Sequence, residues 1–79
     1  MPDVKVLLVD DEIEFVSTLA ERLGLRGLEA LVATDGEEAL ALAASERPRV
    51  VVLDIMMPGM DGLETLKILR RDHPGTQVI

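Results

Sequence analysis

The sequence predicts an α/β fold: a doubly wound parallel sheet with strand order 2-1-3 and the start of a fourth strand beside strand 3. Two observations predict it. Short, β-branched apolar runs alternate along the chain with longer segments of helical periodicity. The runs at 4–9 and 50–53 are almost uninterrupted, which is typical of central strands buried on both faces of a parallel sheet. Because no linker, repeat or low-complexity tract breaks the alternation, we expect residues 1–79 to form one small domain.

The first half of the chain predicts a strand, a helix and a second strand. Residues 4–9 form an apolar run of strand length. Residues 13–25 repeat apolar side chains at the spacing i, i+3, i+4, i+7 of an amphipathic helix, and Gly27 favours an end to that helix. Residues 28–33 are a weaker strand because Glu29 interrupts them, so this strand suits an edge of the sheet.

The second half repeats the alternation twice. Residues 34–38 (TDGEE) offer a capping box, either from Thr34 to Glu37 or from Asp35 to Glu38, and so predict the start of a helix that runs to about residue 45. After the third strand at 50–53, a further helix is expected over about 62–71. A fourth strand then begins at 77–79.

Acidic residues follow both predicted central strands. Asp10 and Asp11 end the first strand, and Asp54 ends the third. Neighbouring strands lie roughly 4.8 Å apart, so these carboxylates meet at the carboxyl edge of the sheet, where open α/β sheets bind ligands. Two carboxylates about 5 Å apart repel by roughly 3 kcal/mol at an effective dielectric of about 20. Either a proton or a cation must therefore relieve the cluster, and an oxygen-only ligand set suits Mg²⁺.

A simpler interpretation covers part of this cluster. Asp10, Asp11 and Glu12 precede a helix, and acids at a helix start complement its dipole without any other role. That interpretation does not explain Asp54, because a loop follows its strand. The residues alone therefore favour a metal or phosphate site over purely structural acids.

The amino-acid composition and net charge argue against several kinds of site and partner. The chain has no cysteine, which excludes disulfides and thiolate metal sites. Its formal net charge of −7 argues against binding to nucleic acid or to an anionic membrane, since both need a basic face. The N-terminal apolar run is too short for a signal peptide or a membrane span. We therefore expect a soluble, cytoplasmic protein.

Three stretches together resemble a known family. They are VLLVDD, ATDGEEAL and VVVLDIMMPGMDGLE, in this order and spacing. They resemble the N-terminal two-thirds of the receiver domain of response regulators in two-component signalling. The resemblance implies a partial flavodoxin-like sheet, and it makes residues 1–79 a receiver domain that is incomplete at its C-terminus and truncated before the end of the fourth strand.

The resemblance also implies roles for individual residues. Asp54 corresponds to the phosphoacceptor of a phosphorelay, and the donor would be a phosphohistidine on a sensor histidine kinase or a histidine phosphotransfer protein. Mg²⁺ would be bound by Asp11, Asp54 and the backbone carbonyl of Met56, with Asp10 acting through metal-bound water. Such a module is not an enzyme beyond its own phosphorylation and dephosphorylation.

Other residues in these stretches have simpler interpretations. The side chains of Met56 and Met57 suit packing rather than ligation. Asp61 suits the N-cap of the third helix. His73 lies at a helix end, far along the chain from the acids, and suits a surface position or an interaction with the helix dipole.

Positions that the family places later in the domain are not found among these 79 residues. They are a Ser/Thr after the fourth strand and a Lys after the fifth. Lys5 opens the first strand at the opposite edge of the sheet, and Lys67 lies on a predicted helix, so neither can replace that lysine. We also expect an exposed apolar sheet edge, which favours a homodimer, a swapped partner or a second polypeptide that completes the sheet.

The sequence is also compatible with two other functions. One is a receiver fragment that is not phosphorylated and serves as a scaffold or dimerisation module. The other is a Mg²⁺ hydrolase with an aspartyl nucleophile, of the haloacid-dehalogenase type. Those enzymes usually have a second Asp two residues after the nucleophile, and Met56 at that position argues against the hydrolase.

Overall fold

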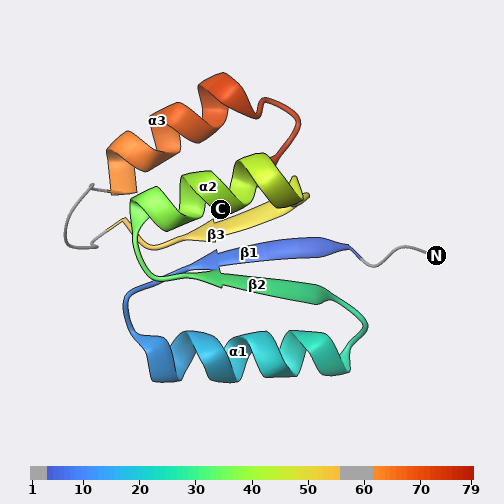
Figure 1. The fold of residues 1–79 in the computed structure, drawn as a ribbon. Coiled ribbons are helices and arrows are strands. Elements are labelled where there is room, and N and C mark those ends of the chain that lie inside the picture. The colour runs from blue at the N-terminus through green and yellow to red at the C-terminus, as the bar shows by residue number, and fades with distance from the viewer. Residues whose placement is uncertain (1–3, 56–61) are drawn as a thin grey trace.

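The computed structural model describes residues 4–55 and 62–79. Within them, strands and helices alternate along the chain, and every pair of neighbouring strands is parallel. The strand order is β2-β1-β3-β4. This confirms the predicted α/β class and strand order, with β2 at one edge (Figure 1). The elements are β1 (Lys5–Val9), α1 (Ile13–Leu25), β2 (Glu29–Ala33), α2 (Gly36–Glu46), β3 (Val50–Leu53), α3 (Gly62–Asp72) and β4 (Gln77–Val78).

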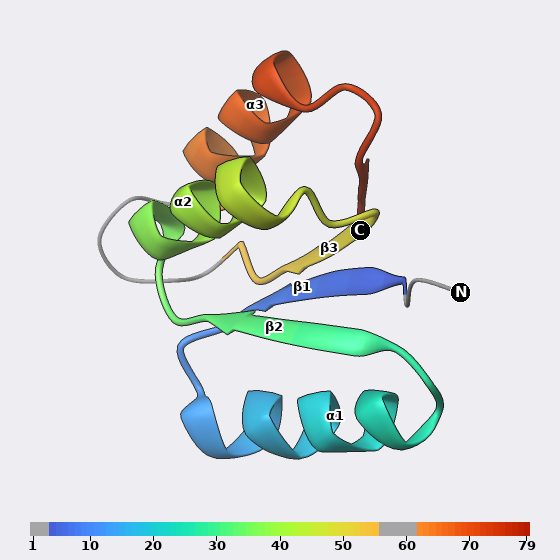
Figure 2. The same ribbon diagram turned by 45° about the vertical axis from the view of Figure 1, so that its right-hand side comes forward.

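Helices cover both sides of the sheet, as a doubly wound fold requires. α2 and α3 lie together on one side, and α1 lies on the other (Figures 1 and 2). Successive side chains of a strand point to opposite faces, so each strand supplies both layers of the core. Val51 packs in the layer under α2 and α3, whereas Val50 packs in the layer under α1.

The layer under α2 and α3 is closely packed. Its buried strand residues include Leu7 and Val51, and Leu69 of α3 is fully buried against them. Two alanines, Ala39 and Ala43, form the buried face of α2, and their small side chains allow this helix to approach the sheet closely.

The layer under α1 is smaller. Val6 and Leu8 of β1 and Val16 of α1 are its buried residues. α1 packs against β2 and β1, while Val52 of β3 and Ile79, beside β3, stay exposed. The sequence predicted an exposed apolar edge. In the structure, the exposed apolar residues lie on the part of this face that α1 does not cover.

Local chemistry accounts for the helix boundaries. The Asp35 side chain accepts a hydrogen bond of 2.8 Å from the Glu38 amide, so the capping box is the one from Asp35 to Glu38. The Glu38 carboxylate accepts in turn from the Thr34 amide at 2.7 Å. β2 begins one residue later than predicted because the Leu28 amide still donates to the Leu23 carbonyl at the end of α1.

Candidate functional site

The carboxyl ends of β1 and β3 position two of the predicted acids. The Asp10 amide donates to the Ala33 carbonyl of β2, and the Asp54 amide donates to the Val9 carbonyl of β1, both at 3.0 Å. Each acid therefore continues a strand ladder by one hydrogen bond. These two hydrogen bonds hold the backbones of Asp10 and Asp54 at the same edge of the sheet, independently of any contact between their side chains.

The structure brings the carboxylates of Asp10, Asp11 and Asp54 together. One oxygen from each lies within 4.8 Å of the others. Asp10 and Asp54 are partly buried, and Asp11 is exposed. The three acids predicted to share the switch point are thus neighbours, although their separate roles stay a prediction.

Asp10 also has a local structural role. Its Oδ1 accepts a hydrogen bond of 2.9 Å from the Glu12 amide, just before α1 begins. Glu12 is the N-cap of that helix, but its own side chain makes no capping hydrogen bond. One oxygen of Asp10 therefore has the role expected of an acid at a helix start. The same hydrogen bond orients the Asp10 carboxylate within the acid cluster.

The donor set fits a hard divalent cation. Two ligands on opposite sides of a Mg²⁺ ion are about 4.2 Å apart, because each bond is about 2.1 Å long. Carboxylate oxygens within 4.8 Å of one another are therefore near enough for side-chain rotation to bring them around one ion. Met56, whose carbonyl the resemblance adds to this set, lies outside the described residues, and so do Met57 and Asp61.

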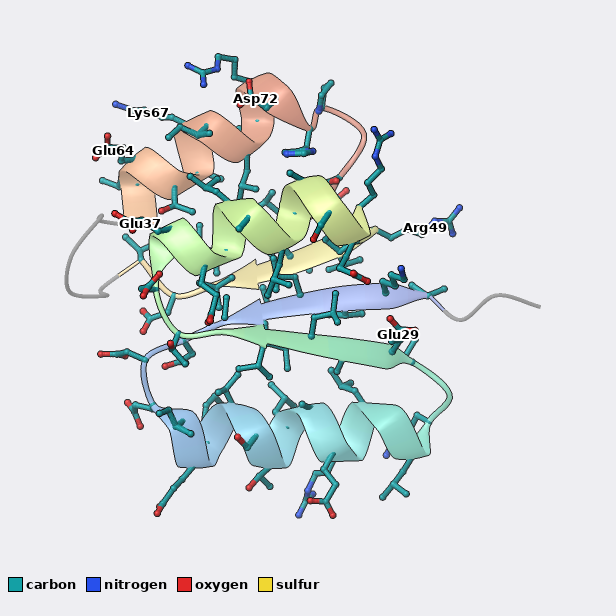
Figure 3. All side chains as sticks on the ribbon, in the orientation of Figure 1. Glu29, Glu37, Arg49, Glu64, Lys67 and Asp72 are labelled. Carbon is teal, nitrogen blue, oxygen red and sulfur yellow. The ribbon has the colours of Figure 1, made fainter. Side chains whose placement is uncertain are left out.

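The other polar candidates lie away from the cluster. Lys5 pairs with Glu46 at 3.1 Å at the amino end of β1. Figure 3 shows Lys67 on the outer side of α3, pointing away from the sheet. His73 follows α3, and the nearby Thr76 hydroxyl donates to the Pro48 carbonyl just before β3, at the end opposite Asp54. These three side chains thus lie away from the acid cluster, and their exclusion from the site stays a prediction.

Sequence reasoning missed a hollow beside the acids. It has a volume of about 290 Å³, and Asp10 and Asp54 form one part of its lining. Apolar side chains from α1, β1 and β3 form the rest, among them Phe15, Leu19 and Val52. Phe15, the one aromatic residue in the chain, is 58% exposed. The available signal was that this apolar residue is not part of the helical series Val16, Leu19, Ala20 and Leu23.

The family profile of the response regulator receiver domain matches residues 6–79. The chain belongs to this family. It is 46% identical over 67 residues to the alkaline phosphatase synthesis transcriptional regulatory protein PhoP of Bacillus subtilis, a match that covers 85% of this chain and 28% of PhoP. The family profile therefore accounts for nearly all of the 79 residues, and the chain spans less than a third of the length of that relative.

Solved structures agree with the family and the fold. The chemotaxis response regulator CheY4 of Vibrio cholerae superimposes with a TM-score of 0.90 at 37% identity, over 98% of this chain and 66% of that one. A structure of the histidine kinase ThkA in complex with the response regulator protein TrrA also matches, with a TM-score of 0.86 and 37% identity, over 95% of this chain and 65% of the matched one. The receiver has the flavodoxin-like order of its relatives.

Proposed function

We propose that this receiver accepts a phosphoryl group on Asp54, with a Mg²⁺ ion bound by the neighbouring acids. The observation that carries the proposal is the convergence of Asp10, Asp11 and Asp54 within 4.8 Å at the carboxyl edge of the sheet. In this proposal the 79 residues are the N-terminal part of a receiver domain, since they cover 66% of the CheY4 chain.

The proposed reaction is a transfer between two side chains. An Asp54 carboxylate oxygen attacks the phosphorus of a phosphohistidine, the phosphorus–nitrogen bond breaks, and its electron pair stays on the imidazole. A divalent ion, when bound, supplies positive charge for the phosphoryl oxygens. Asp11 and Asp54, with the Met56 carbonyl, would hold that ion, and Asp10 would act through bound water. Beyond its own phosphorylation and dephosphorylation we propose no enzymatic activity.

The proposed partner is a sensor histidine kinase or a histidine phosphotransfer protein. Its support is the solved complex of ThkA with TrrA, in which a response regulator contacts a histidine kinase. The exposed position of Asp11 leaves the acid cluster open to such a partner. We place the reaction in the cytoplasm and assign no nucleic-acid or membrane contact to this acidic segment. Within the described residues, no helix is long and apolar enough to cross a bilayer.

Phosphorylation is tested with acetyl phosphate and Mg²⁺, followed by intact mass spectrometry. One phosphoryl group is expected on the unaltered chain, and none on Asp54→Asn. Asp72→Asn is the matched control, because Asp72 is an exposed acid at the far end of α3. An adduct that persists in Asp54→Asn, or no adduct on the unaltered chain, would contradict the proposal.

Ion binding is tested separately by thermal unfolding. Mg²⁺ at ten times its Kd should stabilise the protein by about 1.4 kcal/mol, or raise Tm by roughly 6–11 °C for a domain of this size. The physical reason is relief of repulsion among three carboxylates. Asp11→Asn should reduce this rise, and the same titration with Ca²⁺ compares the two ions. A Tm that does not respond to millimolar Mg²⁺ would mean that these acids bind no ion.

A second candidate function is a scaffold or dimerisation module that works without phosphorylation. It is favoured by the exposed Val52 and Ile79 on the half of the sheet that α1 leaves uncovered, and by β4 at the sheet edge. A homodimer or a swapped partner would cover this surface. Sedimentation velocity should then give an association that neither Mg²⁺ nor Asp54→Asn changes. A monomer at all concentrations would remove this candidate.

A further inference from the structure

We propose that Gly62 is a positioning residue for the Asp54 site. Its missing side chain lets the first turn of α3 rest directly on the backbone of Ile55, the residue after Asp54. The inference deepens the proposed function and rests on it, since it concerns what holds the carboxylate in place for the ion.

The contact leaves no room for a side chain. Gly62 is buried, and a Cβ atom added to it would lie 2.7 Å from the Ile55 carbonyl oxygen and 2.8 Å from the carbonyl carbon, with the Ile55 Cα closer still. Real Cβ atoms essentially never approach other heavy atoms within 3.0 Å. All three atoms belong to the backbone, so no side-chain rotation relieves the overlap. An alanine at 62 must displace either α3 or Ile55.

Space, rather than backbone conformation, requires this glycine. Gly27, just after the C-cap of α1, has a φ of +86°, in the left-handed region that favours glycine. Gly62 is instead the first residue of α3, a position with helical backbone angles. An alanine would therefore accept its backbone angles, and the cost of the substitution lies in the contact with Ile55.

A hydrogen bond ties the same two residues together. The Gly62 amide donates to the Ile55 carbonyl at 3.2 Å, so residues 55 and 62 are joined across the segment 56–61. Ile55 itself is 46% exposed, so burial alone holds this residue only in part. Backbone contact with Gly62 is therefore one restraint on the carboxyl side of Asp54.

Asp54 is thereby restrained from both directions. On its amino side, its amide donates to Val9 of β1 at 3.0 Å. On its carboxyl side, Ile55 rests on Gly62, and α3 is anchored to the core by the fully buried Leu69 and Thr65. A displacement of Ile55 would turn the Asp54 carboxylate away from Asp10 and Asp11. The ion would then lose one ligand or bind with strained geometry.

The test compares Mg²⁺ affinity in Gly62→Ala with that of the unaltered chain, by isothermal titration calorimetry at a temperature where both are folded by circular dichroism. We expect Kd to rise at least fivefold. Gly24→Ala is the matched control, because Gly24 also lies in a helix but nothing approaches its added Cβ within 4 Å, so its Kd should not change. Ile55→Ala should also keep its affinity, because the contact involves the backbone. A Gly62→Ala variant that binds within twofold of the unaltered chain overturns the inference.

A measurement on the unaltered chain keeps the inference falsifiable if Gly62→Ala does not fold. Coupling between two sites is reciprocal, so an ion that needs the Gly62–Ile55 contact must also stabilise it. Hydrogen exchange at the Gly62 amide should therefore slow when Mg²⁺ is added, relative to the Gly27 amide at the distant end of α1. Equal exchange with and without bound Mg²⁺ overturns the inference, whereas an unaltered chain that binds no Mg²⁺ refutes the proposed function itself.

Discussion

The two faces of the sheet are covered to different extents. Under α2 and α3, Val51 is fully buried, whereas the next residue of the same strand, Val52, keeps 37% of its surface exposed on the α1 side. The two side chains are chemically identical and differ only in the face to which they point. Coverage by a helix, and not residue type, therefore decides how much each valine contributes to stability.

The difference follows from where the helices lie across the strands. α2 and α3 pack against each other and together cover their face, while α1 packs on β2 and β1. β3 and β4 thus have an uncovered half-face on the α1 side, within the described part of the chain. The apolar hollow links this half-face to the acid cluster, because Val52 and the acids Asp10 and Asp54 all line it. The site therefore lies at the border between a well-covered and a poorly covered region.

The largest expected effect is a difference in the free energy of unfolding between two matched variants, Val51→Ala and Val52→Ala. Val51→Ala removes buried methyl groups and leaves a cavity, so it should lower the free energy of unfolding by about 2–3 kcal/mol. That is a large share of the roughly 4–12 kcal/mol expected for a domain of this size. Val52→Ala should cost less than about 1 kcal/mol. Urea denaturation measures both, and equal losses would show that the two faces are equally covered.

The next prediction concerns the uncovered half-face as a contact surface. Exposed apolar patches on a sheet favour association with another chain. Val52→Thr keeps the β-branched shape but adds a hydroxyl, so it should weaken any concentration-dependent association seen by sedimentation velocity while leaving the fold unchanged. The control is Val32→Thr, because Val32 packs against the layer that α1 covers. An association that Val32→Thr weakens more than Val52→Thr does would locate the contact elsewhere.

A smaller effect on stability is expected at the C-terminal ends of α1 and α2, which lie on opposite faces of the sheet. Gly27, the residue after the C-cap of α1, has a φ of +86°, whereas the C-cap of α2 is Arg47, which is held at a φ of +49°. Left-handed angles strain a residue with a Cβ, so Arg47→Gly should stabilise the protein by up to about 1 kcal/mol. Gly27→Ala should destabilise it by a similar amount. Thermal unfolding tests both, and a stabilised Gly27→Ala would contradict this account of the helix ends.

The smallest expected effect is on the pH dependence of stability. The hydrogen bond to Glu46, followed by its charge, raises the pKa of Lys5 above its usual value of 10.5. A raised pKa means that this pair stabilises the fold below the unfolded pKa and that the contribution is lost as pH rises through the folded pKa. Lys5→Gln should therefore flatten the alkaline limb of a Tm-against-pH curve above about pH 10. An unchanged alkaline limb would mean that the pair does not stabilise the fold.

Much of the fold could be predicted from residue order because its signals are local. Apolar periodicity gave the bounds of α1 and β3 as the structure has them. The capping residues placed the start of α2. The strand order then brought Asp10 and Asp54 to one edge, since parallel strands end together. Glu29 likewise indicated the edge position of β2.

Other features depend on residues that are distant in sequence and leave no local signal. Lys5 and Glu46 are 41 residues apart, and nothing near either residue indicates their pairing. Gly62 and Ile55 are seven positions apart in the chain, so the sequence displays a glycine but not the backbone that excludes its side chain. The position of α1 across the sheet is likewise set by packing.

The sequence by itself determined the α/β class, the strand order and the set of acids at the carboxyl edge, because periodicity and the ends of strands are properties of short segments. The tertiary structure alone decided how the site is bounded. It placed α1 over β2 and β1, which leaves Val52 exposed beside Asp54, and it set Gly62 against Ile55. Both outcomes depend on close packing between elements, and close packing is a property of three-dimensional contacts that no single segment encodes.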